Sequence, residues 1–123
     1  IQLYDLFDQL PDETRAPFQS QGVAGTVLNY YIEMYLCEGT EVYVMRCPDG
    51  QEDVEGMNGK VAAIRLSGGT AYRTPRGLTV GDTAYRAWLL YGKCAFTSSF
   101  YYQVEDGYVS TIVFHTRYWG SSF

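Results

Sequence analysis

The sequence has few of the residues on which most catalytic and metal sites depend. It contains one histidine and three cysteines, and no Cys/His spacing in it suits a zinc ligand set. No apolar run approaches the roughly 20 residues that a membrane-spanning helix needs. The net charge of −5 opposes binding to the phosphate backbone of nucleic acid and to anionic lipid surfaces. We therefore expect no metal, no cofactor, no nucleic-acid partner and no membrane-spanning segment.

The residues that are present predict one globular domain rich in β-structure. A chain of 123 residues fits a single domain, residues 1–123, and 46% hydrophobic residues are enough for a core. Twelve tyrosines are a high number for this length. Tyrosine favours strands, and its amphipathic ring also suits recognition surfaces.

The three cysteines, Cys37, Cys47 and Cys94, leave at least one thiol unpaired. A tight turn near Glu38–Glu41 places Cys37 opposite about Val42, which leaves Cys47 too far along for a cross-strand disulfide. Buried free thiols and a long-range bridge from Cys94 to either of the other two both stay open.

The first half of the chain reads as a helix followed by three strands. Leu3, Leu6, Phe7 and Leu10 follow helical spacing, and we expect a short helix that ends at Pro11. The segment 11–25 has two prolines, two glycines and little periodicity, so it is interpreted as a loop. The strands are expected at 27–37, 42–47 and 61–66, with an acidic loop over 48–60.

The second half reads as a connector, a helix and a hairpin. Pro75 favours an extended backbone before it. Asp82 or Thr83 can cap a helix whose inner face carries Ala84, Ala87, Trp88 and Tyr91, and Gly92 suits its C-terminal cap. The hairpin spans 100–119, because Asp106–Gly107 is a favoured two-residue turn.

Two segments of the sequence repeat one pattern. Asn58–Leu66 and Asp106–Phe114 both read Asx-Gly-x-Val-x-x-Ile-x-(Leu/Phe), and an expected helix precedes each. We therefore predict two unequal helix-plus-strands units that share one antiparallel sheet. Strict alternation would put Val61 and Ile64 on opposite faces, so either both faces are partly covered or a β-bulge re-aims Val61.

The stretch Arg76–Gly92, followed by an aromatic strand and the Asp-Gly hairpin, resembles a bacterial extracytoplasmic fold. The similar proteins are the beta-lactamase inhibitory protein and the small outer-membrane lipoprotein of the barrel-assembly machinery. The matching positions are Gly77, Leu78, Val80, Gly81, Asp82, Thr83, Tyr91 and Gly92. The resemblance covers about 76–114 and is poor in the first half. It implies a non-enzymatic domain, secreted or lipid-anchored to the cell envelope, that contacts another protein or an envelope component. No inhibitor contact residues can be matched by position.

The sequence starts at Ile1. We expect either a shortened chain or a mature form, in which any signal peptide or lipid-anchor cysteine would no longer be present.

The glycine turn before the second helix does not have the composition of a phosphate-binding loop. Such a loop needs several glycines and a Lys followed by Ser or Thr, whereas Arg76–Thr83 has two glycines and no lysine. Asp82 would repel a phosphate. We interpret the turn as the start of a helix, with Arg73 and Arg76 offering at most a small anion contact.

The acidic loop is a poor match to a calcium site. Its carboxylates are Asp49, Glu52, Asp53 and Glu55. An EF-hand loop requires glycine where Val54 stands and glutamate where Lys60 stands. Weak Ca²⁺ binding stays open, but a solvated acidic loop is the simpler interpretation.

The aromatic residues on the strands are the candidate binding residues. Many of them will be core residues or cross-strand pairs, but rings on an uncovered sheet face favour contact with a protein or a glycan. The residues assigned to this face are Tyr30, Tyr43, Tyr101, Tyr102, Tyr118 and Trp119.

These patterns together predict an α+β domain with two short helices on one face of an antiparallel sheet of about five strands. The expected function is binding, not catalysis. The alternative is a small Cys-His hydrolase-like enzyme that uses Cys94 as nucleophile and His115 as base.

Overall fold

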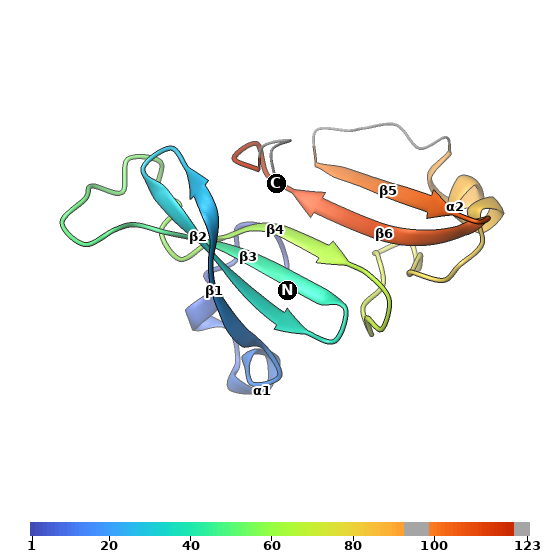
Figure 1. The fold of residues 1–123 in the computed structure, drawn as a ribbon, viewed down its shortest axis with the longest axis horizontal. Coiled ribbons are helices and arrows are strands. Elements are labelled where there is room, and N and C mark those ends of the chain that lie inside the picture. Colours follow the sequence, from blue (N-terminus) through green and yellow to red (C-terminus); the bar gives the residue numbers. More distant parts are fainter. Residues whose placement is uncertain (93–98, 120–123) are drawn as a thin grey trace.

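The computed structural model describes residues 1–92 and 99–119, which form an α+β fold (Figure 1). A 3₁₀ turn, η1, and two α-helices accompany six strands. In chain order the elements are η1 (Phe7–Gln9), α1 (Asp12–Arg15), β1 (Gln19–Val27), β2 (Tyr30–Cys37), β3 (Thr40–Arg46), β4 (Val61–Leu66), α2 (Ala84–Tyr91), β5 (Phe100–Glu105) and β6 (Tyr108–His115).

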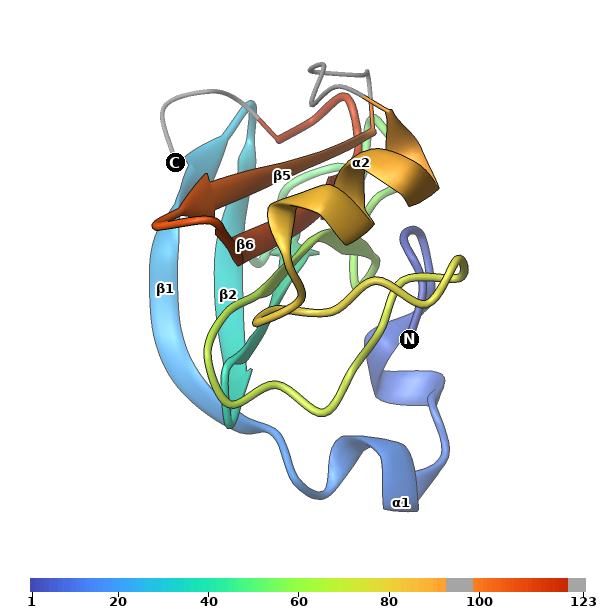
Figure 2. The same cartoon turned by 90° about the vertical axis from the view of Figure 1, so that its right-hand side faces the viewer.

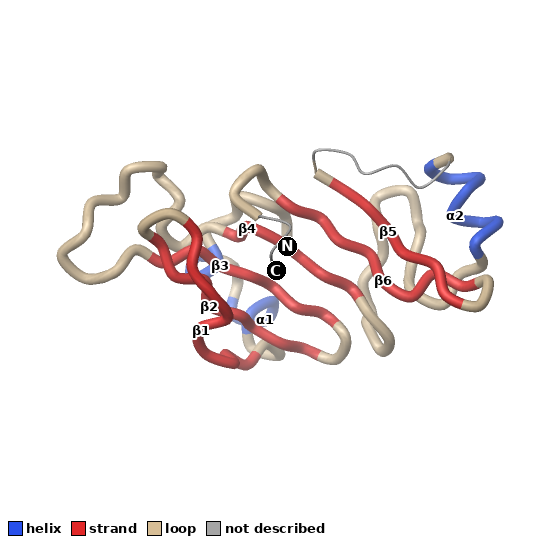
Figure 3. Tube along the Cα trace, turned by 45° about the horizontal axis from the view of Figure 1, so that its top comes forward, coloured by secondary structure: helices blue, strands red, loops and turns tan. Residues whose placement is uncertain are grey.

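The strands form one antiparallel sheet in the order β1-β2-β3-β4-β6-β5 (Figure 3). The sheet has six strands, where five were expected, because β1 lies in the segment interpreted as a loop. This edge strand is exposed along most of its length, so its sequence carries no alternation of apolar and polar residues. The strand expected at 27–37 is divided by a turn in which Leu28 has a φ of 53°.

The helix expected over residues 3–10 is wrong. The backbone of this segment pairs with the start of β4 instead: Val61 N–H donates to the Asp5 carbonyl at 2.9 Å, and Phe7 N–H donates to the Gly59 carbonyl at 2.9 Å. Only the 3₁₀ turn at Phe7–Gln9 is helical. Pro11 stands at the N-cap of α1 rather than ending a helix, a place where its missing N–H costs nothing.

The second helix is confirmed. Thr83 caps α2 by accepting a hydrogen bond from Arg86 N–H on its side-chain oxygen, and Gly92 closes the helix with a φ of 74°. Ala87 is fully buried against the sheet. Trp88, which was expected on the inner face with Ala87, is instead half exposed.

The two faces of the sheet are covered differently. The chain's N-terminal segment, η1 and α2 lie over one face (Figure 2), where they pack on a core that includes Val42, Ile64 and Ile112. The opposite face is covered only near its β2 end, by a smaller cluster of Tyr30, Ile32, Met45, Met57 and Ala62. No helix among the described residues covers the remainder of that face.

The two repeated segments have the same strand geometry. In the β3–β4 pair, Tyr43 faces Ala63 and Val44 faces Val61, so one residue of β4 is bulged out. In the β5–β6 pair, Gln103 faces Thr111 and Val104 faces Val109, with the bulge at the same position. The bulge turns Val61 and Val109 toward the core face.

The segments that precede η1 and α2 are also equivalent. Asp5 accepts on its carboxylate from Gln2 N–H at 2.8 Å, and Asp82 accepts from Thr79 N–H at 2.9 Å. The backbone carbonyl of each aspartate then accepts a hydrogen bond from the valine of the Asx-Gly-x-Val repeat: Val61 N–H donates to Asp5 and Val109 N–H donates to Asp82. The sheet therefore joins two similar units, of which the first carries the extra hairpin β1–β2 and the longer loop between β3 and β4.

Candidate functional site

A groove of about 480 Å³ lies on the uncovered face of the sheet. Its lining comes from β1, β3, β4, β5, β6 and the segment after β6, and it combines small apolar, aromatic and polar side chains. The lining residues are Ala24, Tyr43, Ala63, Arg65, Tyr101, Gln103, Thr111, Val113 and Trp119. Volumes of this order are typical of sites that enclose a ligand or an anchoring side chain.

Equivalent positions of the two units supply most of this lining. Ala63 and Thr111 occupy the same position of the repeat, and so do Arg65 and Val113. On the other strand of each hairpin, Tyr43 and Gln103 are equivalent, since each precedes the bulge. The groove therefore lies where the two units meet.

Tyr43 and Trp119 form the aromatic wall of the groove. Their ring centroids are 4.5 Å apart, at an interplanar angle of 54°. The Tyr43 hydroxyl donates to the Glu41 carboxylate at 3.0 Å, and Arg65 approaches the same carboxylate at 3.5 Å. Burial, followed by the negative charge of Glu41, raises the pKa of Tyr43 to about 12. At neutral pH Tyr43 is therefore a neutral hydroxyl held in place by its acceptor.

Tyr101 forms the wall on the β5 side. Its ring centroid lies 5.9 Å from that of His115. His115 is the last residue of β6 and stands two residues after the groove residue Val113. His115 Nδ1 lies 3.2 Å from the Thr116 carbonyl. Cys94, the partner of His115 in the enzyme alternative, lies outside the described residues, so this pair stays a prediction.

Two of the six candidate binding residues are core residues, which corrects their assignment to the exposed face. Tyr30 belongs to the small cluster under the acidic loop, and Tyr102 points to the helix-covered face; both are almost fully buried. The cause is alternation along the strand, which sends Tyr101 and Tyr102 to opposite faces. Tyr118 is not among the groove-lining residues; it packs against the small cluster, where its hydroxyl donates to Glu55 at 3.3 Å and accepts from Arg117 at 2.8 Å.

The acidic loop is organised by one of its own carboxylates. Asp53 accepts hydrogen bonds from the Tyr30 hydroxyl, from Met57 N–H at 3.0 Å and from Asn58 N–H at 3.2 Å. The bond from Tyr30 is the main reason that the pKa of Asp53 is lowered. Asp53 therefore stabilises the loop conformation. Within residues 1–92 and 99–119, no cluster of three or more His, Cys, Asp or Glu has the geometry of a metal site.

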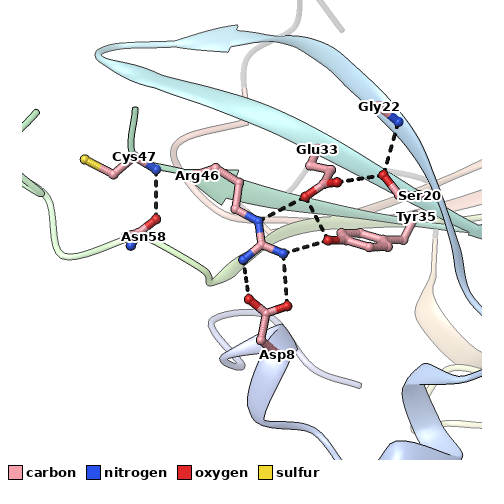
Figure 4. Close-up of polar contacts among 8 residues, drawn as sticks. All are labelled: Asp8, Ser20, Gly22, Glu33, Tyr35, Arg46, Cys47 and Asn58. Atoms are coloured by element: carbon pink, nitrogen blue, oxygen red, sulfur yellow. Dashed lines mark hydrogen bonds and ion pairs between the residues drawn. The ribbon is translucent and has the colours of Figure 1, made fainter. Parts of the chain in front are cut away.

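A polar network around Arg46 connects the N-terminal segment to the sheet (Figure 4). The guanidinium donates two bonds to Asp8 at 2.6 and 3.1 Å, one to Glu33 at 3.2 Å and one to the Tyr35 hydroxyl at 2.7 Å. Ser20 donates to the second oxygen of Glu33 at 2.6 Å. All the strong donors and acceptors of the network are paired with one another, so we interpret it as structural.

The ionisation of this network follows from its hydrogen bonds. The bond from Arg46 lowers the pKa of Asp8. Burial alone would raise the pKa of Glu33, but the bonds from Ser20, Tyr35 and Arg46 outweigh it and the pKa is lowered. Both groups are therefore carboxylates at neutral pH.

The glycine turn starts α2, as the sequence indicates. Gly77 and Gly81 have φ values of 90° and 95°, which only glycine adopts without strain. Arg73 donates to the Gly77 carbonyl at 3.0 Å, and Arg76 donates to the Leu90 carbonyl at 2.8 Å. Both arginines thus fasten the turn and the helix end.

A second hollow, of about 510 Å³, lies on the helix-covered face between the N-terminal segment and the connector before α2. Core side chains such as Val42 and Ile64 form its floor, and Tyr72 and Arg73 lie at its edge.

The thiols of Cys37 and Cys47 are free. Cys94, to which a long-range disulfide from either of them was considered, lies outside the described residues.

Sequence reasoning missed six groove residues: Ala24 on β1, and Ala63, Arg65, Gln103, Thr111 and Val113 on the strands of the two units. Only the register of the repeat could have found the last five, because their residue types carry no distinctive signal.

None of the described helices is long and apolar enough to span a membrane.

Comparisons with protein-family models, with curated proteins and with solved structures give no match to this chain. The resemblance to the beta-lactamase inhibitory protein and to the envelope lipoprotein therefore stays a prediction.

Proposed function

We propose that this chain is a non-enzymatic module that binds another protein through the groove on the uncovered sheet face. The observation that carries the proposal is the groove itself, whose lining combines the rings of Tyr43, Tyr101 and Trp119 with the polar groups of Arg65 and Gln103. Aromatic and arginine side chains are the residue types enriched in the energetic centre of protein interfaces.

A protein partner suits this geometry better than a glycan. A sugar ring stacks on an aromatic face that is flat and open, whereas Tyr43 and Trp119 lie against each other at 54°. The exposed Arg65 and Gln103 instead offer N–H groups that can donate hydrogen bonds to carboxylates and peptide carbonyls.

The location implied by the resemblance, secreted or anchored to the cell envelope, is part of the proposal. Fractionation of the source cells tests it.

The test is a quantitative capture experiment with a groove variant and a matched control. The double variant Arg65→Glu and Gln103→Glu changes two exposed groove side chains. The control, Arg117→Glu, reverses a charge on a more exposed arginine that is absent from the groove lining. We expect the wild type and the control to retain the same protein from extracts of the source cells. The groove variant should retain it at least about tenfold less, equivalent to about 1.4 kcal/mol.

Identical retention by all three proteins would contradict the proposal. So would binding of the wild type to glycans on an array with no protein retained.

A further inference from the structure

Helix α2 has a stripe of exposed apolar side chains. Tyr85, Trp88 and Leu89 are 67%, 51% and 59% exposed. They stand at positions i, i+3 and i+4, which share one side of a helix. The rings of Tyr85 and Trp88 are stacked at a centroid distance of 6.3 Å. The stripe is therefore a continuous apolar surface rather than three scattered side chains.

The inner side of α2 is already occupied. Ala87 is fully buried, and Leu90 and Tyr91 pack against the core. The helix is consequently apolar on two sides, although only one of them faces the protein. A helix with this pattern is typical of one that is covered on both sides, and clustered exposed apolar residues mark interaction sites.

Three arginines lie at or near α2, and two of them make no ion pair with a described carboxylate. Arg76 reaches the C-terminal turn of α2 and lies 5.0 Å over the Tyr91 ring. Arg73 and Arg76 donate to backbone carbonyls and make no ion pair with a described carboxylate. Arg86, on the helix itself, is paired only with Asp82 at 3.3 Å, while its side chain is half exposed. The carboxylates nearest to α2, those of Asp82 and Asp106, lie at its N-terminal end, where Ala84 N–H donates to the Gly107 carbonyl. The positive charge is therefore concentrated at Arg73 and Arg76.

We infer that the exposed side of α2 is a second docking surface, and that its occupant is an acidic amphipathic helix of another protein. The apolar stripe would receive the partner's apolar residues at i, i+3, i+4 and i+7. Arg73, Arg76 and Arg86 would face its carboxylates, which supply orientation and a faster association. This surface belongs to the helix-covered side of the sheet and is independent of the groove.

A second copy of the chain is a weaker fit to the same surface. The acidic loop between β3 and β4 lies at the end of the molecule away from α2 (Figures 1 and 3), so a contact between the two would be head-to-tail and would build a ring or a filament rather than a two-fold dimer. Near its carboxylates this loop exposes one large apolar side chain, Val54, against the three of the stripe.

The experiment uses two synthetic peptides of about 14 residues, long enough to form a helix on binding. Both have leucine and phenylalanine at i, i+3, i+4 and i+7; one has glutamate and the other lysine at the remaining positions. The protein is the variant Trp119→Phe, in which Trp88 is the only tryptophan of the chain. Its fluorescence therefore reports on α2 alone.

We expect the glutamate peptide to shift the Trp88 emission to shorter wavelength and to bind at least about tenfold more tightly than the lysine peptide. Added salt should weaken this binding, because the arginines are exposed. Adding Tyr85→Ser and Leu89→Ser should weaken it by about tenfold or more. The pair Arg73→Gln and Arg76→Gln should reduce the difference between the two peptides, whereas Arg117→Gln should not.

The inference is overturned if neither peptide binds, if both bind equally, or if the Tyr85 and Leu89 changes leave binding intact. Self-association in sedimentation that the same two changes abolish would also overturn it, because the occupant would then be a second copy. Circular dichroism of each variant verifies that the fold is retained. The groove variant Arg65→Glu, Gln103→Glu should bind the glutamate peptide normally, which separates this result from that of the proposed function.

Discussion

Arg65 and Val113 face each other across β4 and β6, and they occupy the same position of the two repeated segments. The pairing on either side is symmetric, because Ile64 faces Phe114 and Leu66 faces Ile112. The two units are thus related by an approximate two-fold rotation whose axis passes through the Arg65–Val113 pair. Both residues line the groove, so the candidate site lies on this axis. The side chains at equivalent positions differ, as Tyr43 and Gln103 do, so the groove itself is not symmetric.

Replacing Arg46 by methionine should destabilise the protein by about 1–3 kcal/mol. The side chain of Arg46 is only 14% exposed, and its removal leaves Glu33 partly buried without its charged donor. Urea denaturation monitored by tryptophan fluorescence measures the change. Arg65→Met is the matched control: its ion pair is longer and more exposed, so we expect less than about 1 kcal/mol. Equal losses for the two variants would contradict a structural role for the Arg46 network.

Stability should fall as the pH is lowered through the acidic range. Hydrogen bonds lower the pKa of Asp8 and Glu33 in the folded state from their ordinary values of 3.8 and 4.5. The unfolded chain therefore takes up these protons at a higher pH than the folded one, and it binds more protons within that range. The stabilisation is complete above about pH 5.5 and is lost progressively below the ordinary values.

Denaturation curves measured between pH 7 and pH 3 test this dependence on the wild type and on Asp8→Asn, Glu33→Gln. The double variant should lose less stability on acidification. A similar change at Asp12, whose carboxylate is 94% exposed, serves as the control. Parallel pH profiles for wild type and double variant would exclude the network as the source.

Gly39→Ala should cost about 3 kcal/mol or more. Gly39 has a φ of 71°, and an added Cβ would lie 2.5 Å from the Gly68 carbonyl oxygen and 2.6 Å from Thr70 N. Gly50→Ala separates strain from collision, because Gly50 has a φ of 80° with nothing within 4 Å of the added Cβ. We expect it to cost only about 1 kcal/mol, so thermal midpoints should differ clearly between the two variants.

Thr83→Ala should destabilise the protein by about 1 kcal/mol, since the side-chain oxygen of Thr83 accepts from Arg86 N–H at 3.1 Å. Thr83→Ser retains the hydroxyl and should have little effect. Amide hydrogen exchange in the first turn of α2 should accelerate in the alanine variant alone. Unchanged exchange there would show that the cap does not hold the helix.

Sequence patterns located the elements whose signals are local. Strand β4 matches its predicted range of 61–66, and the Asp106–Gly107 turn has both residues at positive φ, as the dipeptide requires. The repeat also pointed correctly to two adjacent strands of one sheet. In contrast, the apolar spacing of residues 3–10 predicted a helix where a strand-like pairing with β4 forms. In this segment the backbone hydrogen bonds to a neighbouring strand outweigh the local preference for a helix. Tertiary context often overrides helix propensity in this way.

The candidate site was only partly accessible to the same reasoning. Three of the residues assigned to the uncovered face, Tyr43, Tyr101 and Trp119, line the groove, but alternation alone does not reveal which face of a sheet the helices cover. That choice puts Tyr101 in the groove and Tyr102 in the core.

The order of residues by itself determined the Asp106–Gly107 turn, the caps of α2 and the repeat, because each depends on neighbouring residues and on backbone geometry. Only the tertiary structure decided that η1 and α2 both cover the same face, that β1 joins the sheet as an edge strand and that Trp88 faces solvent. These outcomes depend on which surfaces remain after the long-range pairing of strands, and that pairing joins residues far apart in the chain.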